Sequence, residues 1–254
     1  MQRQATTTAV AITIENLTKD YGDVRAVDGL TLEIPGAEVF GLLGPNGSGK
    51  TTTINCLTGL QKPTSGTVTV GGFDVQREGQ RAREILGVSP QETAVFDCLT
   101  GRENVELFGS LYSVPKASLG ARVDYAIEKV GLMDDAGRRV SKYSGGMKRR
   151  VSIAMALVTD PRIILLDEPT VGMDPQSRRA VWDFILELRD KGKTVLLTTH
   201  YMEEAEELCD KVGIIDHGKL IALGTPAELK ARYGTRDLED VFIQLTGRRI
   251  REGA

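Results

Sequence analysis

The eight residues 44–51 restrict the fold of this chain more than any other feature of its sequence. They read Gly-Pro-Asn-Gly-Ser-Gly-Lys-Thr, which matches the Gly-x-x-x-x-Gly-Lys-Ser/Thr pattern of a phosphate-binding loop. A continuous apolar run, residues 39–43, precedes this loop, and a helical pattern over residues 51–60 follows it. Glycines let successive N–H groups converge on phosphate oxygens, and the helix start adds its positive end. The sequence therefore predicts a strand, a phosphate-binding loop and a helix in succession.

The last residues of the loop predict the chemistry of the site. Lys50 can reach the β- and γ-phosphates of a nucleotide, and the hydroxyl of Thr51 can hold Mg²⁺. The residues expected to bind the nucleotide here are Gly44, Pro45, Asn46, Gly47, Ser48, Gly49, Lys50, Thr51 and Thr52.

The remaining apolar segments predict an α/β fold. Runs typical of strands buried on both faces cover residues 39–43, 163–166, 195–198 and 212–215. Helical patterns lie between them, and this alternation is typical of a mostly parallel sheet. Shorter strand patterns cover residues 12–17, 31–34, 67–70 and 85–89. From about residue 92 to residue 158 helical spacing replaces strand patterns, so a helical insertion is expected there.

Composition excludes several classes of protein. The 254 residues are 41% apolar and 26% charged, which is too apolar for a disordered chain. A net charge of −3 gives no strong field for nucleic acid or an anionic membrane, so we expect no nucleic-acid partner. Cys56, Cys98 and Cys209 are too far apart for a metal-ligand motif. No run reaches the roughly 18 apolar residues of a membrane span, so we expect a cytoplasmic chain.

Two carboxylates follow the apolar run 163–166. Asp167 and Glu168 come directly after it, and ligands bind at the carboxyl edge of an open α/β sheet. Alone, such a pair would be an ordinary surface feature at a strand end. Beside a phosphate-binding loop, Asp167 is expected to hold Mg²⁺ through its water shell. Glu168 is expected to orient or deprotonate an attacking water.

A third motif narrows the choice among nucleotide hydrolases. Tyr143-Ser144-Gly145-Gly146-Met147 is similar to the Leu-Ser-Gly-Gly-Gln signature of ATP-binding cassette transporters, and it precedes the helix that leads to Asp167. The chain resembles the ATP-binding subunit of such a transporter over about residues 10–224. Tyr143 and Met147 replace the usual Leu and Gln. Met147 followed by Lys-Arg-Arg resembles the drug-resistance and multidrug-exporter branch.

The resemblance implies roles for three further residues. Tyr21 resembles the aromatic residue that stacks on adenine. Gln91 resembles the glutamine that contacts Mg²⁺ and the attacking water, and His200 resembles the histidine that contacts the γ-phosphate. The implied catalytic set is Glu168, His200, Gln91 and Lys50, and the implied ligands of Mg²⁺ are Thr51, Gln91 and Asp167.

The resemblance also implies a dimer. Ser144, Gly145 and Gly146 start a helix with bare N–H groups, which favours anions. In the family this site closes on the γ-phosphate held by a second copy, so two composite sites form in a head-to-tail dimer. Asp174 lies in a segment, 172–175, that resembles the loop crossing the dimer interface near Glu168.

The implied fold is a P-loop NTPase (RecA-like) core with a small antiparallel β subdomain and a helical subdomain insertion. We expect an ATPase domain over residues 10–224, with the helical subdomain at about 92–160. Residues 1–9 are expected to be loose, and residues 225–254 to form a short helical extension with a basic, solvated end at Arg248, Arg249 and Arg251. Glu203, Glu204, Glu206 and Glu207 are expected to form a solvated helix face.

The predicted function is ATP hydrolysis that powers the export of drugs or other hydrophobic small molecules. Because no membrane span is evident, a separate membrane subunit is expected, with this chain peripheral on the inner face of the cell membrane. The alternative is a non-transport cassette ATPase that acts on a soluble partner such as the ribosome. A GTPase-like switch would want an Asn-Lys-x-Asp motif, which the sequence lacks. A small-molecule kinase would not explain residues 143–147 or His200.

Overall fold

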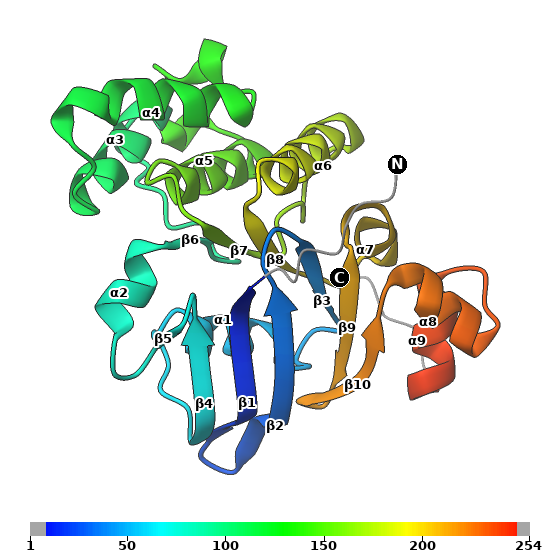
Figure 1. The fold of residues 1–254 in the computed structure, drawn as a ribbon. Coiled ribbons are helices and arrows are strands. Elements are labelled where there is room, and N and C mark those ends of the chain that lie inside the picture. The colour runs from blue at the N-terminus through cyan, green and yellow to red at the C-terminus, as the bar shows by residue number, and fades with distance from the viewer. Residues whose placement is uncertain (1–8, 248–254) are drawn as a thin grey trace, which may run out of the picture.

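The computed structural model describes residues 9–247 of the chain. Of the predicted loose segment 1–9, residues 1–8 lie outside the described residues, as does the basic end with Arg248, Arg249 and Arg251. Two sheets form the centre of the molecule, one of six strands in the order β10-β9-β3-β8-β7-β6 and one of four in the order β2-β1-β4-β5 (Figure 1).

The larger sheet is parallel except at one edge. Its parallel strands are β3 (Val39–Leu43), β6 (Leu86–Ser89), β7 (Ile163–Asp167), β8 (Thr194–Thr199) and β9 (Lys211–Asp216). Every residue of β3, β7 and β8 is buried, as continuous apolar runs predict. The sequence patterns missed β10 (Lys219–Gly224), which pairs antiparallel with β9. It contains a short apolar run, residues 220–223, but only one of its residues is buried.

The smaller sheet is antiparallel and covers the first helix. It contains β1 (Val10–Tyr21), β2 (Val24–Pro35), β4 (Ser65–Val70) and β5 (Phe73–Asp74). Helix α1 (Lys50–Leu57) contacts β2 and β4 of this sheet and β7 of the larger one, so it lies between the two. One apolar cluster, which includes Ile12, Phe40 and Ile54, joins all three layers. The helix ends earlier than the predicted residue 60, because Gly59 takes a left-handed backbone with φ of 74°.

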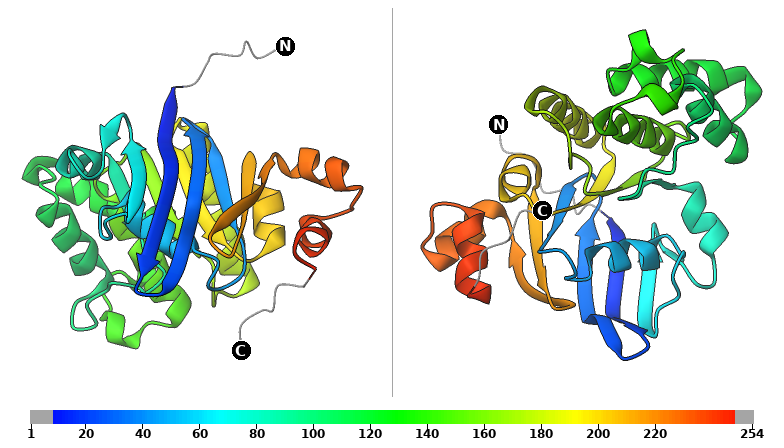
Figure 2. Two further views of the ribbon diagram at one scale, coloured as in Figure 1. Left: turned by 90° about the horizontal axis from the view of Figure 1, so that it is seen from below. Right: turned by 180° about the vertical axis from the view of Figure 1, so that it is seen from behind.

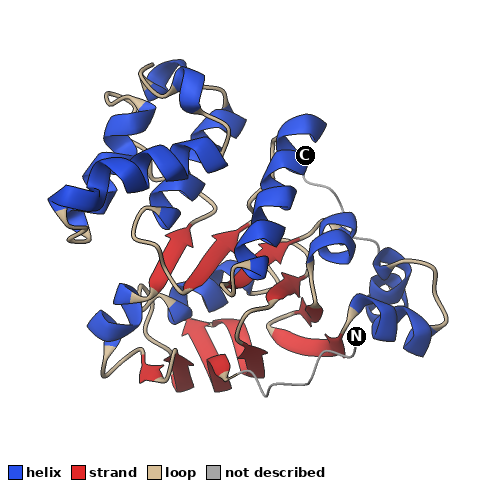
Figure 3. Ribbon diagram, turned by 45° about the horizontal axis from the view of Figure 1, so that its top comes forward, coloured by secondary structure: helices blue, strands red, loops and turns tan. Residues whose placement is uncertain are grey.

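Helices gather at one end of the sheets. After α2 (Gly79–Glu84), the helical part contains α3 (Gly101–Leu111), α4 (Lys116–Lys129), two short 3-10 turns (Met133–Asp135 and Val140–Lys142) and α5 (Gly145–Leu157). Helices α3, α4 and α5 contact one another through buried side chains that include Val105, Val123 and Ile127. Figures 2 and 3 show this group standing away from the antiparallel sheet. The predicted fold class, an α/β core with antiparallel and helical parts, is confirmed.

Helix α6 (Pro175–Asp190) lies beside α5, and the remaining helices lie on the side away from α3 and α4 (Figure 1). They are α7 (Met202–Leu208), α8 (Pro226–Tyr233) and α9 (Leu238–Thr246). Helix α9 contacts α7 and α8, far from α3 and α4 in Figures 1 and 2. Glu206 on α7 accepts hydrogen bonds from Lys230 Nζ at 2.8 Å and from Leu238 N at 2.5 Å. Glu206 thereby holds the start of α9.

The prediction that the glutamates of α7 form a solvated face is wrong in part. Glu203 and Glu207 are exposed, but Glu206 is half-buried and Glu204 is only 1% exposed. The carboxylate of Glu204 accepts hydrogen bonds from Thr170 Oγ1 at 2.8 Å and Trp182 Nε1 at 3.0 Å. Donors from distant segments let this acid be buried, and the sequence of α7 alone does not reveal them.

Candidate active site

Two glycines let the loop that follows β3 approach its neighbours closely. A Cβ on Gly44 would collide with the carbonyl oxygen of Ile215, and a Cβ on Gly49 would collide with that of Ala26. Gly49 also has a φ of 105°, a conformation that side chains rarely adopt. It precedes α1 without any side-chain cap, so the first N–H groups of α1 have no side-chain acceptor.

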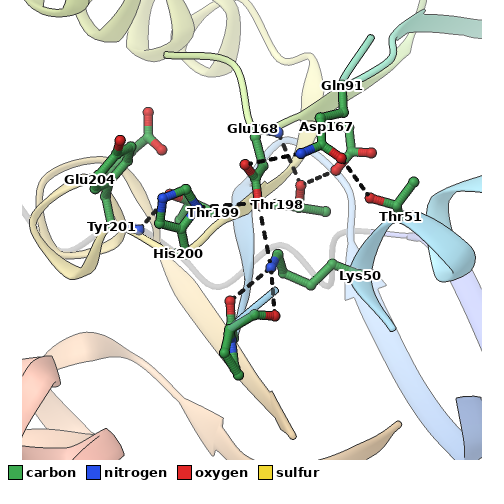
Figure 4. A network of polar contacts seen from close by, with 12 residues as sticks. Lys50, Thr51, Gln91, Asp167, Glu168, Thr198, Thr199, His200, Tyr201 and Glu204 are labelled. Carbon is green, nitrogen blue, oxygen red and sulfur yellow. Dashed lines mark hydrogen bonds and ion pairs between the residues drawn. The ribbon is translucent and has the colours of Figure 1, made fainter. Parts of the chain in front are cut away.

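Lys50 is buried at the base of this loop. Its ammonium donates hydrogen bonds to the carbonyl oxygens of Gly44 at 2.7 Å and Pro45 at 3.0 Å. The same nitrogen lies 3.5 Å from Glu168 Oε1 (Figure 4). Burial lowers the pKa of Lys50, and the charges of Glu168 and Asp167 oppose that shift.

Oxygen ligands converge beside the lysine. The hydroxyl of Thr51 donates to Gln91 Oε1 at 3.5 Å, and Gln91 Nε2 donates to Glu168 Oε2 at 3.4 Å. Asp167 accepts a hydrogen bond from the Thr198 hydroxyl at the end of β8. Hydroxyl, amide and carboxylate oxygens are the ligands that Mg²⁺ prefers. The donor set of Thr51, Gln91 and Asp167 therefore fits a magnesium ion.

Glu168 has an unusual backbone and lies beside both Lys50 and His200. Its φ is 52°, and its N–H donates to both the carbonyl and the hydroxyl oxygen of Thr198. His200 Nδ1 lies 3.2 Å from Glu168 Oε1, although the contact is not aligned as a hydrogen bond. Burial alone would raise the pKa of Glu168, but His200 and Lys50 together outweigh it and hold the pKa below its ordinary value. The carboxylate is therefore ionised near neutral pH.

A cavity of about 410 Å³ opens over these residues. Its lining includes Lys50, Thr51, Gln91 and Glu168, together with the loop residues Asn46, Gly47, Gly49 and Thr52. Tyr21, at the end of β1, lies on its rim with 43% of its surface exposed. The single chain therefore brings together most of the residues that the sequence singled out.

The signature residues lie outside this cavity. Ser144, Gly145, Gly146 and Asp174 are not among the residues that line it. Ser144 is the N-cap of α5 and accepts from the N–H of Met147 at 3.2 Å, and Asp174 is the N-cap of α6 and accepts from Ser177 N at 2.9 Å. Gly146 packs beside Met173. The signature and the segment that contains Asp174 are thus neighbours of each other, not of the loop.

Sequence reasoning missed two residues that shape the site. Thr198 contacts both Asp167 and Glu168, and Arg149 on α5 donates hydrogen bonds to the backbone oxygens of Gln91 and Asp167. A polar pair, Thr198-Thr199, inside an apolar strand was a usable signal for Thr198. Arg149 lies in a run of three basic residues, which gives no sign that one of them is buried.

Comparison with known proteins agrees with this geometry. The sequence profile of the ABC transporter family matches residues 27–171. The linearmycin resistance ATP-binding protein of Bacillus subtilis is 43% identical over 94% of this chain and 75% of its own length. The daunorubicin/doxorubicin resistance ATP-binding protein of Streptomyces peucetius is 46% identical over 90% of this chain and 69% of its own length.

Solved structures of the same kind share the fold. An ATP-binding subunit of an ABC transporter superposes with a TM-score of 0.85 at 26% identity, covering 93% of this chain and 99% of that one. A dimeric ATP-binding cassette in a post-hydrolysis state, bound to ADP and phosphate, superposes with a TM-score of 0.77 at 27% identity. The match covers 84% of this chain and 98% of that one. None of the helices within residues 9–247 is long and apolar enough to cross a membrane. The chain belongs to the ABC transporter family, as an ATP-binding and ATP-hydrolysing subunit rather than a cassette that acts on the ribosome.

Proposed function

We propose that this ATPase drives the export of drugs or other hydrophobic small molecules through a separate membrane subunit. The meeting of Lys50, Thr51, Gln91 and Glu168 around one cavity carries the ATPase part of the proposal. The names of two relatives, which describe resistance to linearmycin and to daunorubicin and doxorubicin, support the class of cargo.

Lys50 and the loop amides would hold the phosphates of ATP, while Tyr21 on the rim of the cavity would stack on adenine. Lys50 has a second role in this scheme, because it neutralises Glu168 before nucleotide arrives. When its ammonium turns from the Gly44 and Pro45 carbonyls toward phosphate, Glu168 loses a cationic neighbour. The pKa of Glu168 then rises, which makes the carboxylate a better base for the attacking water.

Three oxygen-bearing residues, Thr51, Gln91 and Asp167, would hold Mg²⁺, which neutralises phosphate charge when bound. Gln91 also donates to Glu168, so it would position the base as well as the metal. His200 lies against the other side of Glu168 and would steady the γ-phosphate. Catalysis then rests on positioning and charge neutralisation, as in phosphoryl transfer generally.

A second copy of the chain would complete each site. Ser144, Gly145 and Gly146 lie outside the cavity of their own chain, and Ser144 and Gly145 are exposed. In a head-to-tail dimer they would contact the γ-phosphate bound by the partner, with Asp174 near the interface. The solved cassette that is similar to this chain is dimeric, which supports a dimer here.

We further propose how the chain divides its tasks. Residues 10–224 form the ATPase domain, and the helical subdomain at about 92–160 docks on the membrane subunit. Residues 225–254 are a short extension. The working position is cytoplasmic, on the inner face of the cell membrane.

Copurification tests the membrane partner. The tagged chain is fractionated from its native cell, and proteins that accompany it after gentle detergent extraction are identified. We expect it to sediment with membranes together with a multi-helix membrane protein. A chain that stays soluble, or that sediments with ribosomes, would refute the transport proposal while leaving the ATPase activity intact.

Drug accumulation tests the direction of transport and the class of cargo. Cells without the chain should accumulate more of a fluorescent anthracycline than parent cells. Plasmid-borne parent chain should restore low accumulation, and so should Glu203→Gln, which alters an exposed glutamate. Glu168→Gln should not. Equal accumulation in all five strains would refute export of this kind of molecule.

A further inference from the structure

A buried arginine lies behind the nucleotide cavity, on the side away from solvent. Arg149 is in the second turn of α5 and is 4% exposed. Within residues 9–247 no acidic side chain lies within ion-pair distance of it. Burial lowers the pKa of Arg149, and the more distant charges of Asp167, Glu168 and Glu204 oppose that shift. A cation buried without an adjacent counter-ion is costly, so its position calls for an explanation.

The guanidinium of Arg149 is hydrogen-bonded to backbone oxygens of two separate segments. Nη1 donates to the carbonyl oxygen of Gln91 at 2.9 Å and to that of Pro90, just after β6. Nη2 donates to the carbonyl oxygen of Asp167, and Nε lies 3.4 Å from that of Pro169, just after β7. A planar fork can satisfy such divergent acceptors at once, whereas the single ammonium of a lysine cannot.

Two of these carbonyls belong to residues whose side chains we place at the magnesium site. Gln91 reaches from this backbone toward Thr51 and Glu168, as Figure 4 shows. Asp167 reaches from it toward Thr198. The Arg149 side chain therefore fixes the backbone of two of the three proposed metal ligands, Gln91 and Asp167.

The helix that carries Arg149 starts at the signature. Ser144 caps α5, and Arg149 follows one turn later. A rigid helix turn transmits displacement, so a shift of residues 144–146 would move the guanidinium and the carbonyls bonded to it. The start of α5 and the edge of the sheet are thus joined by one side chain.

We infer that Arg149 is a positioning residue that couples the signature at the start of α5 to Gln91 and Asp167. Docking of one chain's signature on its partner's nucleotide would then adjust the magnesium ligands of that chain's own site. This inference rests on the proposed magnesium site and the proposed dimer.

The test measures nucleotide binding and not only turnover. All proteins carry Glu168→Gln to suppress hydrolysis. The Mg²⁺ concentration that gives half-maximal binding of a fluorescent ATP analogue is measured for the parent, for Arg149→Lys and for Arg149→Gln. Arg122→Lys is the matched control, because Arg122 also donates to a backbone oxygen, that of Thr159, at 2.8 Å, but far from the cavity. Sedimentation with ATP then measures dimer formation at each Mg²⁺ concentration.

We expect Arg149→Lys to raise the half-saturating Mg²⁺ concentration by about tenfold, the usual effect of losing a residue that orients metal ligands. Arg149→Gln should raise it at least as much, and dimer formation should shift by the same factor. Arg122→Lys should match the parent. A purely structural role would reduce the folded fraction but leave the half-saturating concentration of the folded fraction unchanged.

Two results would overturn the inference. One is equal Mg²⁺ dependence in the Arg149 variants and the control. The other is a shift in binding without a shift in dimer formation, which would break the link to α5. Binding that needs no Mg²⁺ even in the parent would instead refute the proposed metal site itself, so the two failures are distinguishable.

Discussion

The N-termini of helices α1 and α5 have similar sequences but lie in different surroundings. Helix α1 follows Gly-Ser-Gly and α5 begins at Ser-Gly-Gly, so both starts combine small residues with free backbone N–H groups. The start of α1 has no side-chain cap and opens into a cavity with the buried Lys50. The start of α5 is exposed, and it is capped by Ser144, whose hydroxyl accepts a hydrogen bond from Met147 N. This difference underlies our proposal that the first forms a phosphate site within one chain, whereas the second contributes to a site on another copy.

The largest expected effect comes from removing the Lys50 ammonium at the start of α1. Lys50→Ala removes the one ammonium in the cavity lining that pairs with Glu168, so ATP binding should weaken by roughly 100-fold, the scale of truncating a buried charged partner. Turnover should fall to background. Titration of the purified chain with a fluorescent ATP analogue measures the binding. Lys219→Ala, which removes an exposed lysine paired with Asp28, should bind like the parent. Unchanged affinity of Lys50→Ala would contradict a phosphate role for Lys50.

The next effect separates chemistry from binding at the same helix start. Glu168→Gln keeps an acceptor near Lys50 and His200 but removes the base, so turnover should fall on the order of 100-fold. ATP affinity should stay within a few-fold of the parent. Phosphate release and equilibrium binding, measured on one preparation, give both numbers, and Glu203→Gln is the exposed control. Undiminished turnover would refute the assignment of Glu168.

A smaller and more selective effect is expected at α5. Ser144→Ala should leave binding of ATP to the single chain unchanged, because Ser144 does not line the cavity. It should weaken the ATP-dependent dimer and cost about 1 kcal/mol of stability through the lost cap. Sedimentation of the Glu168→Gln form with ATP measures the dimer. Ser141→Ala, at an exposed serine three residues earlier, is the control. Weaker ATP binding by the single chain would show that the two helix starts are not separable.

The sequence was most informative where one short segment determines its own local structure. Residues 44–51 specify a turn and a helix start by themselves, and the buried strands β3, β7 and β8 are continuous apolar runs. The α1 side of the comparison could therefore be predicted from spacing alone. The role of the α5 start came from resemblance, because a Ser-Gly-Gly cap is equally consistent with a plain helix N-terminus.

What could not be predicted depends on contacts between distant segments. Arg149 and Glu204 both lie in runs of like charge that suggest a solvated surface, yet both are buried. Carbonyls of Gln91, after β6, and of Asp167, at the end of β7, accept from Arg149, and side chains from two distant segments donate to Glu204. The strand β10 was missed although residues 220–223 are apolar, because its pairing with β9 at the edge of the sheet is also a contact that the local pattern does not show.

The smallest expected effect concerns residues 168–174, which contact Lys50 near the start of α1 and Gly146 at the start of α5. Glu204 accepts from Thr170, which lies between Glu168 and the Asp174 loop that adjoins Gly146. Burial raises the pKa of Glu204, while hydrogen bonds from Thr199, Thr170 and Trp182 and the charge of Arg178 oppose that shift. Cys209, whose own pKa burial raises, also faces this carboxyl.

A raised pKa in the folded state means that the neutral acid is the favoured buried form. The stability that Glu204 contributes is then fully present below its ordinary pKa of 4.5 and is lost as the pH rises through its raised value. Glu204→Gln keeps an acceptor for Thr170 and Trp182 but cannot ionise. The melting temperature of this variant should therefore rise relative to that of the parent as the pH increases. The expected difference is a few degrees, read from melting curves between pH 5 and pH 8, with Glu203→Gln tracking the parent. Parallel curves for the parent and Glu204→Gln would mean that Glu204 remains charged when buried. Thr170, in the segment from Glu168 to Asp174, would then donate its hydrogen bond to an ionised carboxylate rather than to a neutral acid.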